Sequence, residues 1–223
     1  MVSAFILDLD GTLVDLLGLH WLGFRTVAVE GWGMDFPRED VEVNYGKSAE
    51  EIAKAFFEKH NVTGVDYKAF ARKRRDVVLR KLREGYKVKM LPGAMELLKE
   101  LKAKKVKTAL ATSNSREMGE AILSAAGLKD YFQAFVYRED IKKGKPAPDI
   151  FLKAAKMLNV RPEECVVVED SVYGVAAGKA AKMKVVAVAT GTQPKSELLK
   201  QKPDLVLETL EAGLENLSAL IRS

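Results

Sequence analysis

The sequence predicts an α/β protein: a doubly wound, mainly parallel sheet with a Rossmann-like core, into which a small all-α domain is inserted. Short apolar runs alternate with helical patterns at the start of the chain and again from about residue 91 onward, which is typical of a parallel sheet covered by helices. Residues 16 to about 85 instead carry helical signals and no convincing strand. The expected organisation is a core of residues 1–14 and 88–223 and a helical cap of residues 15–87.

Each strand and helix of the core is predicted from the residue pattern of its own segment. The apolar run from Val2 to Leu7 suits a strand that is buried on both faces. Gly127 is expected to stop a helix, and strand-like runs return after it. The other expected strands are 106–111, 135–137, 166–168, 185–188 and 205–207, and the expected helices are 94–103, 116–126, 149–158, 172–181 and a last one at the end of the chain.

Three helices are expected in the cap. Residues 16–30 are apolar and compatible with a helix that ends at a Gly-Trp-Gly segment. Ser48 and Glu51 have the spacing of a capping box, so a second helix is expected to follow Ser48. Asp66 is expected to cap a third helix that runs to about residue 84.

The first strand ends in two carboxylates and a glycine, Asp8, Asp10 and Gly11. Residues two apart in a strand point the same way, so both carboxylates would enter the crevice where open α/β sheets bind ligands. Gly11 would allow a sharp turn there. The alternative is that Asp10-Gly11 is an ordinary turn and Asp8 a solvated strand end.

Polar residues also follow later strands. Thr112, Ser113 and Asn114 come directly after one of them, and a hydroxyl with exposed backbone N–H groups suits a phosphate oxygen. Ordinary capping of the next helix is the alternative. Lys145 precedes a Pro-Ala-Pro segment whose prolines fix the backbone, although a solvated lysine is the ordinary reading of such a residue.

Glu169 and Asp170 end another buried strand. Two adjacent buried acids are costly unless something compensates their charge. With Asp8 and Asp10 they would place four carboxylates at one edge of the sheet, so a divalent cation is expected, and oxygen ligands suit Mg²⁺. A helix-capping role for Asp170 is compatible with this interpretation.

Composition narrows the class of protein. A net charge of +5 could serve a nucleic acid or a small anionic substrate, but the one dense basic run, residues 72–75, is best interpreted as a solvated helix face. No apolar run approaches a membrane span, and the N-terminal run lacks a basic leader. The single Cys165 suits a reducing cytosol and is interpreted as a buried small hydrophobe. We therefore expect a cytoplasmic protein, a monomer or a weak homodimer, that binds neither nucleic acid nor membrane.

The string from Asp8 to Asp15, Asp-Leu-Asp-Gly-Thr-Leu-Val-Asp, resembles the first motif of the haloacid dehalogenase superfamily in its phosphatase and β-phosphoglucomutase-like branch. The segments at Thr112, at Lys145 and at Glu169-Asp170 resemble its later motifs, in the same order and at the same spacing. The resemblance covers essentially the whole chain, including a helical cap inserted after the first strand.

This resemblance implies a role for each matching residue. Asp8 would be the nucleophile that attacks phosphorus and forms an aspartyl phosphate, and Asp10 would be the acid and base. Mg²⁺ would lie on the Asp8 carboxylate, the Asp10 backbone carbonyl and Asp170, with Glu169 binding it directly or through water. The phosphoryl oxygens would be held by three groups, namely the Thr112 side chain, the Ser113 backbone N–H and the Lys145 side chain, with Asn114 beside them. Asp10 also argues against the dehalogenase branch, whose members protonate no phosphate ester.

The resemblance places two substrate-binding candidates in the cap. His20 falls where some sugar-phosphate mutases carry a cap histidine, although a packed core histidine is at least as good an interpretation on this apolar helix. Lys47 lies in the cap turn around Gly46, where the mutases carry a lysine just before the glycine and an arginine three residues after it. Here those positions are Tyr45 and Ala49, so a second phosphate clamp is missing.

The sequence therefore predicts a Mg²⁺-dependent phosphatase that hydrolyses small phosphorylated metabolites. A sugar-phosphate mutase is the first alternative. A phospho-accepting module without turnover, similar to a response-regulator receiver, is the second, and the inserted cap and Asp10 argue against it.

Overall fold

The computed structural model describes residues 2–44 and 48–222. It divides the chain into a core unit, Met1–Asp15 with Val88–Ser223, and a helical unit, Leu16–Lys87. The sequence prediction placed Asp15 in the insert. The structure places it in the core, because its backbone pairs with that of Lys89 in a short strand.

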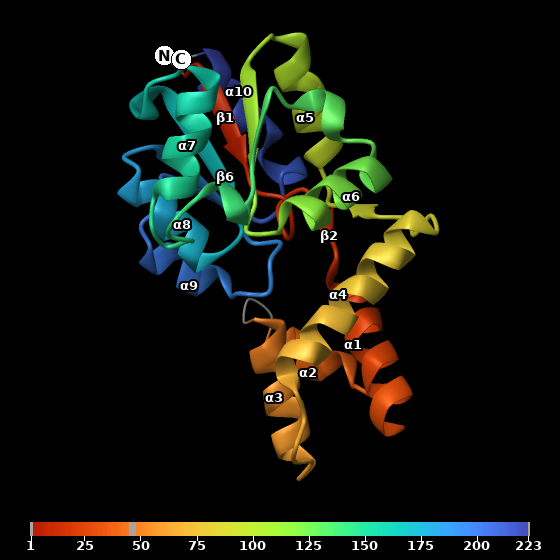
Figure 1. Cartoon of the computed structure of the whole chain (residues 1–223). Coiled ribbons are helices and arrows are strands. Elements are labelled where there is room, and N and C mark those ends of the chain that lie inside the picture. Colours follow the sequence, from red (N-terminus) through yellow and green to blue (C-terminus); the bar gives the residue numbers. More distant parts are fainter. Residues whose placement is uncertain (1, 45–47, 223) are drawn as a thin grey trace. The chain divides into compact units, whose positions relative to one another are not determined.

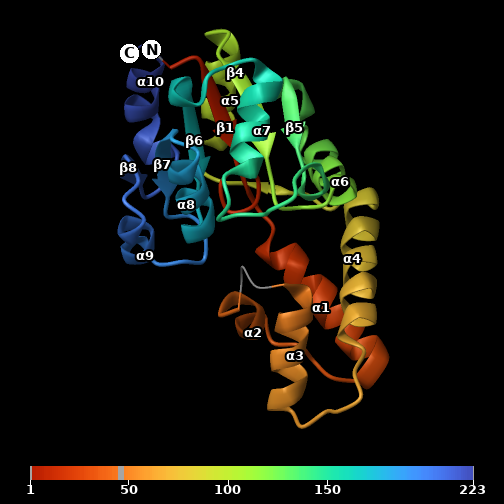
Figure 2. The same cartoon turned by 60° about the vertical axis from the view of Figure 1, so that its left-hand side comes forward.

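The core is built on a six-stranded sheet with the order β5-β4-β1-β6-β7-β8, and every pair of neighbouring strands is parallel. Figure 2 shows β1 in the middle of this sheet. The predicted doubly wound parallel sheet is confirmed. The strands are β1 (Ala4–Leu7), β4 (Lys107–Ala111), β5 (Ala134–Val136), β6 (Cys165–Glu169), β7 (Lys184–Val188) and β8 (Leu205–Leu207).

The position of β1 explains its apolar sequence. All four of its residues are fully buried, as expected for a strand with helices on both faces. The chain runs from β4 outward to β5 on one side and then returns to β6 on the other side of β1. The order of the strands therefore reverses beside β1, and the carboxyl end of β1 lies at the kind of crevice where α/β sheets bind ligands.

Helices cover both faces of the sheet. On one face α7 (Asp149–Leu158) and α8 (Val172–Ala180) pack on alternate residues of the strands, such as Ile6 and Val167, in one hydrophobic cluster. On the opposite face α5 (Ala94–Ala103) contacts β4 and α10 (Leu214–Arg222). Figure 1 shows this layered arrangement, which also includes α6 (Arg116–Ala126) and α9 (Lys195–Lys200).

A second, two-stranded sheet lies where the chain leaves and re-enters the core. Strand β2 (Val14–Asp15) pairs antiparallel with β3 (Lys89–Met90), with Val14 opposite Met90. The Leu91 N–H extends the ladder by donating to the Leu13 carbonyl at 2.9 Å. This sheet was not predicted, because two-residue strands are too short to show a hydrophobic period.

The helical unit contains α1 (Leu17–Trp32), α2 (Arg38–Glu42), α3 (Ala49–Lys59) and α4 (Tyr67–Arg83). The predicted capping box is confirmed: the Glu51 N–H donates to Ser48 Oγ at 3.2 Å, and the Ser48 N–H donates to Glu51 Oε2 at 2.9 Å. Asp66 caps α4 by accepting from the Ala69 N–H at 2.9 Å. Helix α2 was not predicted.

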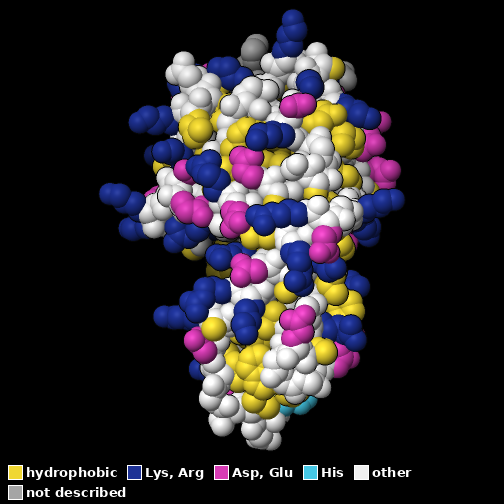
Figure 3. All heavy atoms as spheres, turned by 45° about the vertical axis from the view of Figure 1, so that its right-hand side comes forward, with side chains coloured by type: hydrophobic (Ala, Val, Ile, Leu, Met, Phe, Trp, Pro, Cys, Tyr) yellow, Lys and Arg dark blue, Asp and Glu magenta, His cyan; other side chains and the backbone are white. Residues whose placement is uncertain are grey.

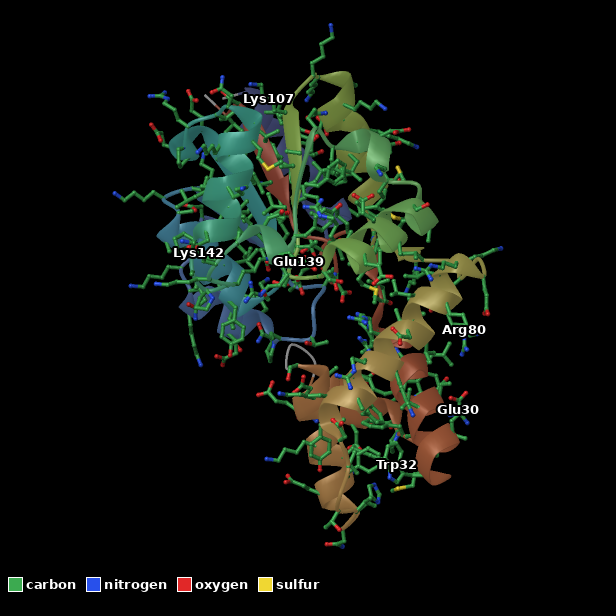
Figure 4. The ribbon with its side chains drawn as sticks, viewed as in Figure 1. Glu30, Trp32, Arg80, Lys107, Glu139 and Lys142 are labelled. Atoms are coloured by element: carbon green, nitrogen blue, oxygen red, sulfur yellow. The ribbon has the colours of Figure 1, made fainter. Side chains whose placement is uncertain are left out.

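Aromatic rings fill the interior of the helical unit. Phe36 stacks on Phe56 with ring centroids 4.0 Å apart. Trp32, at the end of α1 (Figure 4), packs its ring 4.8 Å from Phe57 and 5.9 Å from Phe70. Phe36, Phe56, Phe57 and Phe70 all belong to the buried hydrophobic core of the helical unit. In the described part of the chain, no helix combines the length and the apolar character needed to cross a bilayer.

Candidate active site

Three neighbouring strands bring the predicted site residues to one edge of the core sheet. In the register of β1 with β4 and β6, Leu7 lies opposite Leu110 and Val168. Asp8 is therefore level with the ends of β4 and β6, and its N–H donates to the Val168 carbonyl at 3.1 Å. Thr112 and Asp170 follow these two strand ends directly.

The loop after β1 makes a tight turn. The amides of Leu13 and Val14 both donate to the Leu9 carbonyl, and Gly11 has a φ of +83°, which suits glycine. A turn is thus part of the motif. The alternative for Asp8 is wrong, however, because its side chain is not a solvated strand end: Asp8 is only 6% exposed.

Lys145 connects the two acidic motifs. Its Nζ donates to Asp8 Oδ1 at 2.6 Å and also contacts Glu169 Oε1. All three side chains are buried, so this lysine is not a solvated charge. Burial opposes the charged form of the Lys145 amine, but the two carboxylates outweigh it and hold the Lys145 pKa above its usual value.

Glu169 and Asp170 occupy different environments although they are adjacent. The second Glu169 oxygen, Oε2, accepts from the Ser171 N–H and hydroxyl, both at 2.9 Å. Asp170 accepts from the Thr12 hydroxyl at 3.2 Å. The helix-capping role that was considered compatible with metal binding by Asp170 is wrong, because Ser171 caps α8 through the Gly174 N–H at 3.0 Å.

The buried acids perturb one another. Burial, reinforced by Glu169 and Asp10, raises the pKa of Asp8 to about 7, although Lys145 opposes this shift. Burial also raises the pKa of Asp170 well above its usual value, and the charges of Glu169, Asp8 and Asp10 add to the effect. The site therefore holds more negative charge than its one buried lysine compensates.

A divalent cation fits this donor set. Among residues 2–44 and 48–222, no group of three or more Asp, Glu, His or Cys side chains has the arrangement of a complete metal site. A cation at this edge of the sheet would therefore be bound by the two carboxylates of Asp8 and Asp170 together with a backbone oxygen. Hard oxygen donors and excess buried negative charge suit Mg²⁺. Glu169 already uses both of its oxygens, so its direct ligation of a metal stays a prediction.

The turn after β4 presents the candidate phosphate-binding groups. Asn114 donates to the Thr112 hydroxyl oxygen from its backbone at 3.2 Å and from its side chain at 3.1 Å. Helix α6 is capped by the Ser115 hydroxyl, which accepts from the Met118 N–H at 3.3 Å. The alternative of a capping role for residues 112–114 is therefore wrong, and this turn does not serve the helix that follows.

The segment after β5 supports the same turn. Thr112 donates its N–H to the Val136 carbonyl, and Arg138 donates its N–H to the Asn114 carbonyl, both at 3.0 Å. Glu139, labelled in Figure 4, accepts from the Arg116 N–H at the start of α6 at 3.0 Å. The turn is thus tied to its neighbouring strand on both sides of Ser113.

The structure describes only one of the two substrate-binding candidates in the cap, His20 and Lys47. His20 is buried on α1, and its Nδ1 contacts the Arg74 guanidinium on α4, so it lies in the interior of the helical unit. Whether His20 contacts a substrate stays a prediction. Lys47 lies outside the described residues, as do Tyr45 and Gly46.

The basic run of residues 72–75 is mostly a solvated helix face. Arg75 pairs with Asp76 at 3.5 Å on the surface. Arg74 differs from this expectation, because it is partly buried and its guanidinium lies 5.0 Å from the Phe24 ring centroid. On the face drawn in Figure 3, basic and acidic side chains alternate and form no large area of one sign.

Some contacts of the site were not predicted. Thr12, Ser171, Thr190 and Gly191 all touch the acidic residues or the loop after β1. The one available signal was position, since each follows a strand directly or lies within a few residues of its carboxyl end. Small polar residues are common in such loops, so composition alone did not single them out.

Comparison with known proteins agrees with this arrangement. The profile of the family described as haloacid dehalogenase-like hydrolase matches residues 5–188. The β-phosphoglucomutase of Bacillus subtilis is 35% identical over 224 residues, covering 96% of each protein. The bifunctional riboflavin kinase/FMN phosphatase of Arabidopsis thaliana is 36% identical over 216 residues, and there the chain spans about half of the relative, 53% of its length.

A solved structure supports the same assignment. The crystal structure of a putative β-phosphoglucomutase from Thermotoga maritima superposes with a TM-score of 0.82 at 30% identity, covering 98% of this chain and 99% of that one. Profile, relatives and structure thus agree with the motifs at the carboxyl edge of the sheet. The chain belongs to the haloacid dehalogenase-like hydrolase family.

Proposed function

We propose that this protein is a Mg²⁺-dependent phosphatase that hydrolyses small phosphomonoesters through an aspartyl phosphate on Asp8. The observation that carries the proposal is the position of Lys145, which holds Asp8 at 2.6 Å and also contacts Glu169 in a buried site. A buried amine bonded to the nucleophilic carboxylate orients that carboxylate and places positive charge where phosphoryl charge develops.

In the first half of the reaction an Asp8 oxygen attacks phosphorus in line. The bond between that oxygen and phosphorus forms while the ester bond to the leaving oxygen breaks. Asp10 gives its proton to the leaving oxygen, which departs as an alcohol. The Thr112 hydroxyl, the Ser113 N–H and Lys145 hold the equatorial phosphoryl oxygens.

In the second half Asp10, now ionised, accepts a proton from water. The water oxygen bonds to phosphorus, the bond to Asp8 breaks, and inorganic phosphate leaves with Asp8 regenerated as a carboxylate. When bound by Asp8, Asp170 and the Asp10 carbonyl, Mg²⁺ would supply charge that neutralises the phosphoryl oxygens and keeps Asp8 ionised. Glu169 keeps Lys145 in place through both halves.

The hydrolase is preferred to the mutase because of the cap sequence. One relative is named a β-phosphoglucomutase and another an FMN phosphatase, so both activities occur among similar chains. A mutase must hold a bisphosphate at both ends, and the basic positions that serve this in the mutases are Tyr45 and Ala49 here. Water is therefore expected to take the phosphoryl group.

A cytoplasmic location is part of the proposal. Cys165 is buried, and burial raises the pKa of its thiol to about 11, so it is neither a disulfide partner nor a nucleophile. Two small substrate classes follow from the relatives, namely sugar phosphates and FMN-like phosphomonoesters.

The test uses the purified full chain with Mg²⁺ and a panel of phosphomonoesters, with inorganic phosphate as the readout. Phosphate release that requires Mg²⁺ and is lost in Asp8→Asn supports the proposal. Asp130→Asn, an exposed acid of the same unit, is the matched control and should keep full activity. β-Glucose 1-phosphate with a trace of the 1,6-bisphosphate tests the alternative: if glucose 6-phosphate appears faster than inorganic phosphate, the mutase is correct.

A further inference from the structure

We propose that Thr190 and Gly191, in the loop between β7 and α9, are positioning residues that hold the Asp170 carboxylate and the loop after β1 in the arrangement that binds the cation. This inference rests on the proposed function, since it concerns the same Mg²⁺ site. Neither residue belongs to the motifs at Asp8, Thr112, Lys145 and Glu169.

The first observation is the close approach of two loops to one oxygen. A Cβ atom at Gly11 would lie 2.2 Å from Asp170 Oδ2, and a Cβ atom at Gly191 would lie 2.1 Å from the same oxygen. Both distances are far below a van der Waals contact, so any side chain at either position would displace the carboxylate. Asp170 is therefore enclosed between the backbones of two loops that are distant in the sequence.

The second observation is a bond that ties these loops together. The Thr190 hydroxyl donates to the Gly11 carbonyl at 2.6 Å. Thr12, the next residue along, donates its hydroxyl to Asp170 Oδ1 at 3.2 Å. Thr190 thus holds the peptide that positions Gly11 against one Asp170 oxygen and Thr12 against the other.

The third observation explains why such support is needed. Asp170 is only 8% exposed, and two more buried carboxylates, Asp8 and Glu169, lie at the same edge of the sheet. A carboxylate repelled by these neighbours would turn away from them when no cation is bound. The two loop backbones and the Thr12 hydroxyl restrict that movement, so the carboxylate is already in place when a cation arrives, as outer contacts of metal sites generally ensure.

The obvious variant, Gly191→Ala, forces a methyl group into the Asp170 carboxylate and carries the risk of misfolding. Thr190→Val removes the hydroxyl but keeps the shape of the side chain, and Thr190→Ser restores the hydroxyl. Thr209→Val is the control for the loss of a threonine hydroxyl elsewhere. Thr209 Oγ1 accepts from the Ala212 N–H at 3.1 Å, whereas the Thr190 hydroxyl donates, and neither Thr209 nor Ala212 belongs to the site.

The experiment measures Mg²⁺ affinity without substrate, by calorimetry on the full chain, and the melting temperature of the chelator-treated protein. Thr190→Val is expected to raise the Mg²⁺ Kd roughly 10-fold or more, the usual effect of losing an outer contact of a metal ligand. Thr190→Ser and Thr209→Val should bind within about twofold of wild type. Mn²⁺ binding followed by its paramagnetic resonance signal provides the same comparison with a second ion.

Three outcomes decide the question. A raised Kd in Thr190→Val, rescued by serine, supports the positioning role. An unchanged Kd with a lowered melting temperature means that the bond is merely structural, and it overturns this inference while the phosphatase proposal stands. Absence of Mg²⁺ binding in the wild type overturns the metal dependence of the proposed function and this inference with it.

Discussion

The two units of this chain have interiors of opposite character. The helical unit buries rings, such as Phe36 against Phe56 at 4.0 Å, and keeps pairs such as Arg25 and Asp35 on its surface. The carboxyl edge of the core sheet buries charges, with Lys145 between Asp8 and Glu169. One interior is stabilised by apolar area, whereas the other is costly to form and is held by specific hydrogen bonds.

The comparison separates stability from chemistry. Replacing an aromatic ring in the helical unit should lower stability and leave the acidic site unchanged. Replacing an acid at the sheet edge should abolish chemistry and even relieve repulsion. Substitutions in each region therefore test whether these two functions are as separate as the packing indicates.

The largest effect is expected for Asp8→Asn. The amide keeps the shape of the side chain but is no nucleophile, so kcat should fall at least about 1000-fold. In chelator the variant should melt no lower than wild type, because it removes one of several repelling buried charges. Steady-state phosphate release and thermal melting check both statements, and turnover within tenfold of wild type would exclude Asp8 as the nucleophile.

The next effect is expected for Lys145→Met, which breaks a buried ion pair and leaves two carboxylates uncompensated. We expect at least about a 100-fold loss of kcat/KM and a free energy of unfolding lower by roughly 3–5 kcal/mol at pH 8. The loss of stability should be smaller at pH 5, because burial raises the pKa of Asp8 to about 7 and this carboxyl is protonated at pH 5. Lys107→Met is the control, because Lys107 (Figure 4) donates to the Leu158 carbonyl far along the sheet. Equal destabilisation at both pH values would contradict this account.

Phe36→Ala in the helical unit is expected to lower stability without changing the acidic site of the core. Removing a fully buried ring should cost roughly 3–5 kcal/mol. Hydrogen exchange should report faster exchange of amides in α1 to α4 and unchanged protection of β1 and β6. The Mg²⁺ Kd should stay within about twofold of wild type, and a large change in it would show that the two interiors are coupled.

The last expected effect is a pH dependence of the stability of the metal-free protein. Burial raises the pKa of Asp8 in the folded state to about 7, from about 3.9 in an unfolded chain. Between these values the folded state binds more protons than the unfolded state, so Asp8 makes stability fall as pH rises from about 4 to 7. In chelator, the melting temperature of Asp8→Asn relative to that of the wild type should therefore increase from pH 5 to pH 8. A difference that is the same at both pH values would refute the assignment.

The stabilisation of the folded protein by bound Mg²⁺ should change with pH in the opposite direction. Its ligands must be ionised, so the rise in melting temperature on adding Mg²⁺ should be larger at pH 8 than at pH 5.

The sequence predicted those parts of the fold that repeat a pattern. Buried strands such as β1 and β6 are apolar runs, and the capping box at Ser48 is a local signal, so both were found. Strands β2 and β3 have two residues each, and α9 has no apolar face long enough to show a period. These elements exist because of their partners in space, which a local pattern does not contain.

The same distinction applies to the candidate site. Four site residues could be identified because each lies in a short sequence motif with a fixed order of residue types. They are Asp8, Thr112, Lys145 and Asp170. Thr190 could not be identified in this way, since its role comes from one bond to Gly11, which lies at the other end of the sequence. The buried position of His20 was among the predicted alternatives, but its contact with Arg74 across two helices was not predicted.

The pairing of β2 with β3 has a consequence for the chain as a whole. Topologically, residues 16–87 are the loop of a β-hairpin whose two strands are held in register by the core. The entropic cost of closing a flexible loop rises only with the logarithm of its length, so even an insert of this length costs roughly 2–3 kcal/mol more than a four-residue turn. A hairpin of this kind accepts different loops without altering the sheet that carries the acids. The acidic residues at the edge of the core sheet and the sequence of the insert are thereby able to change independently of each other.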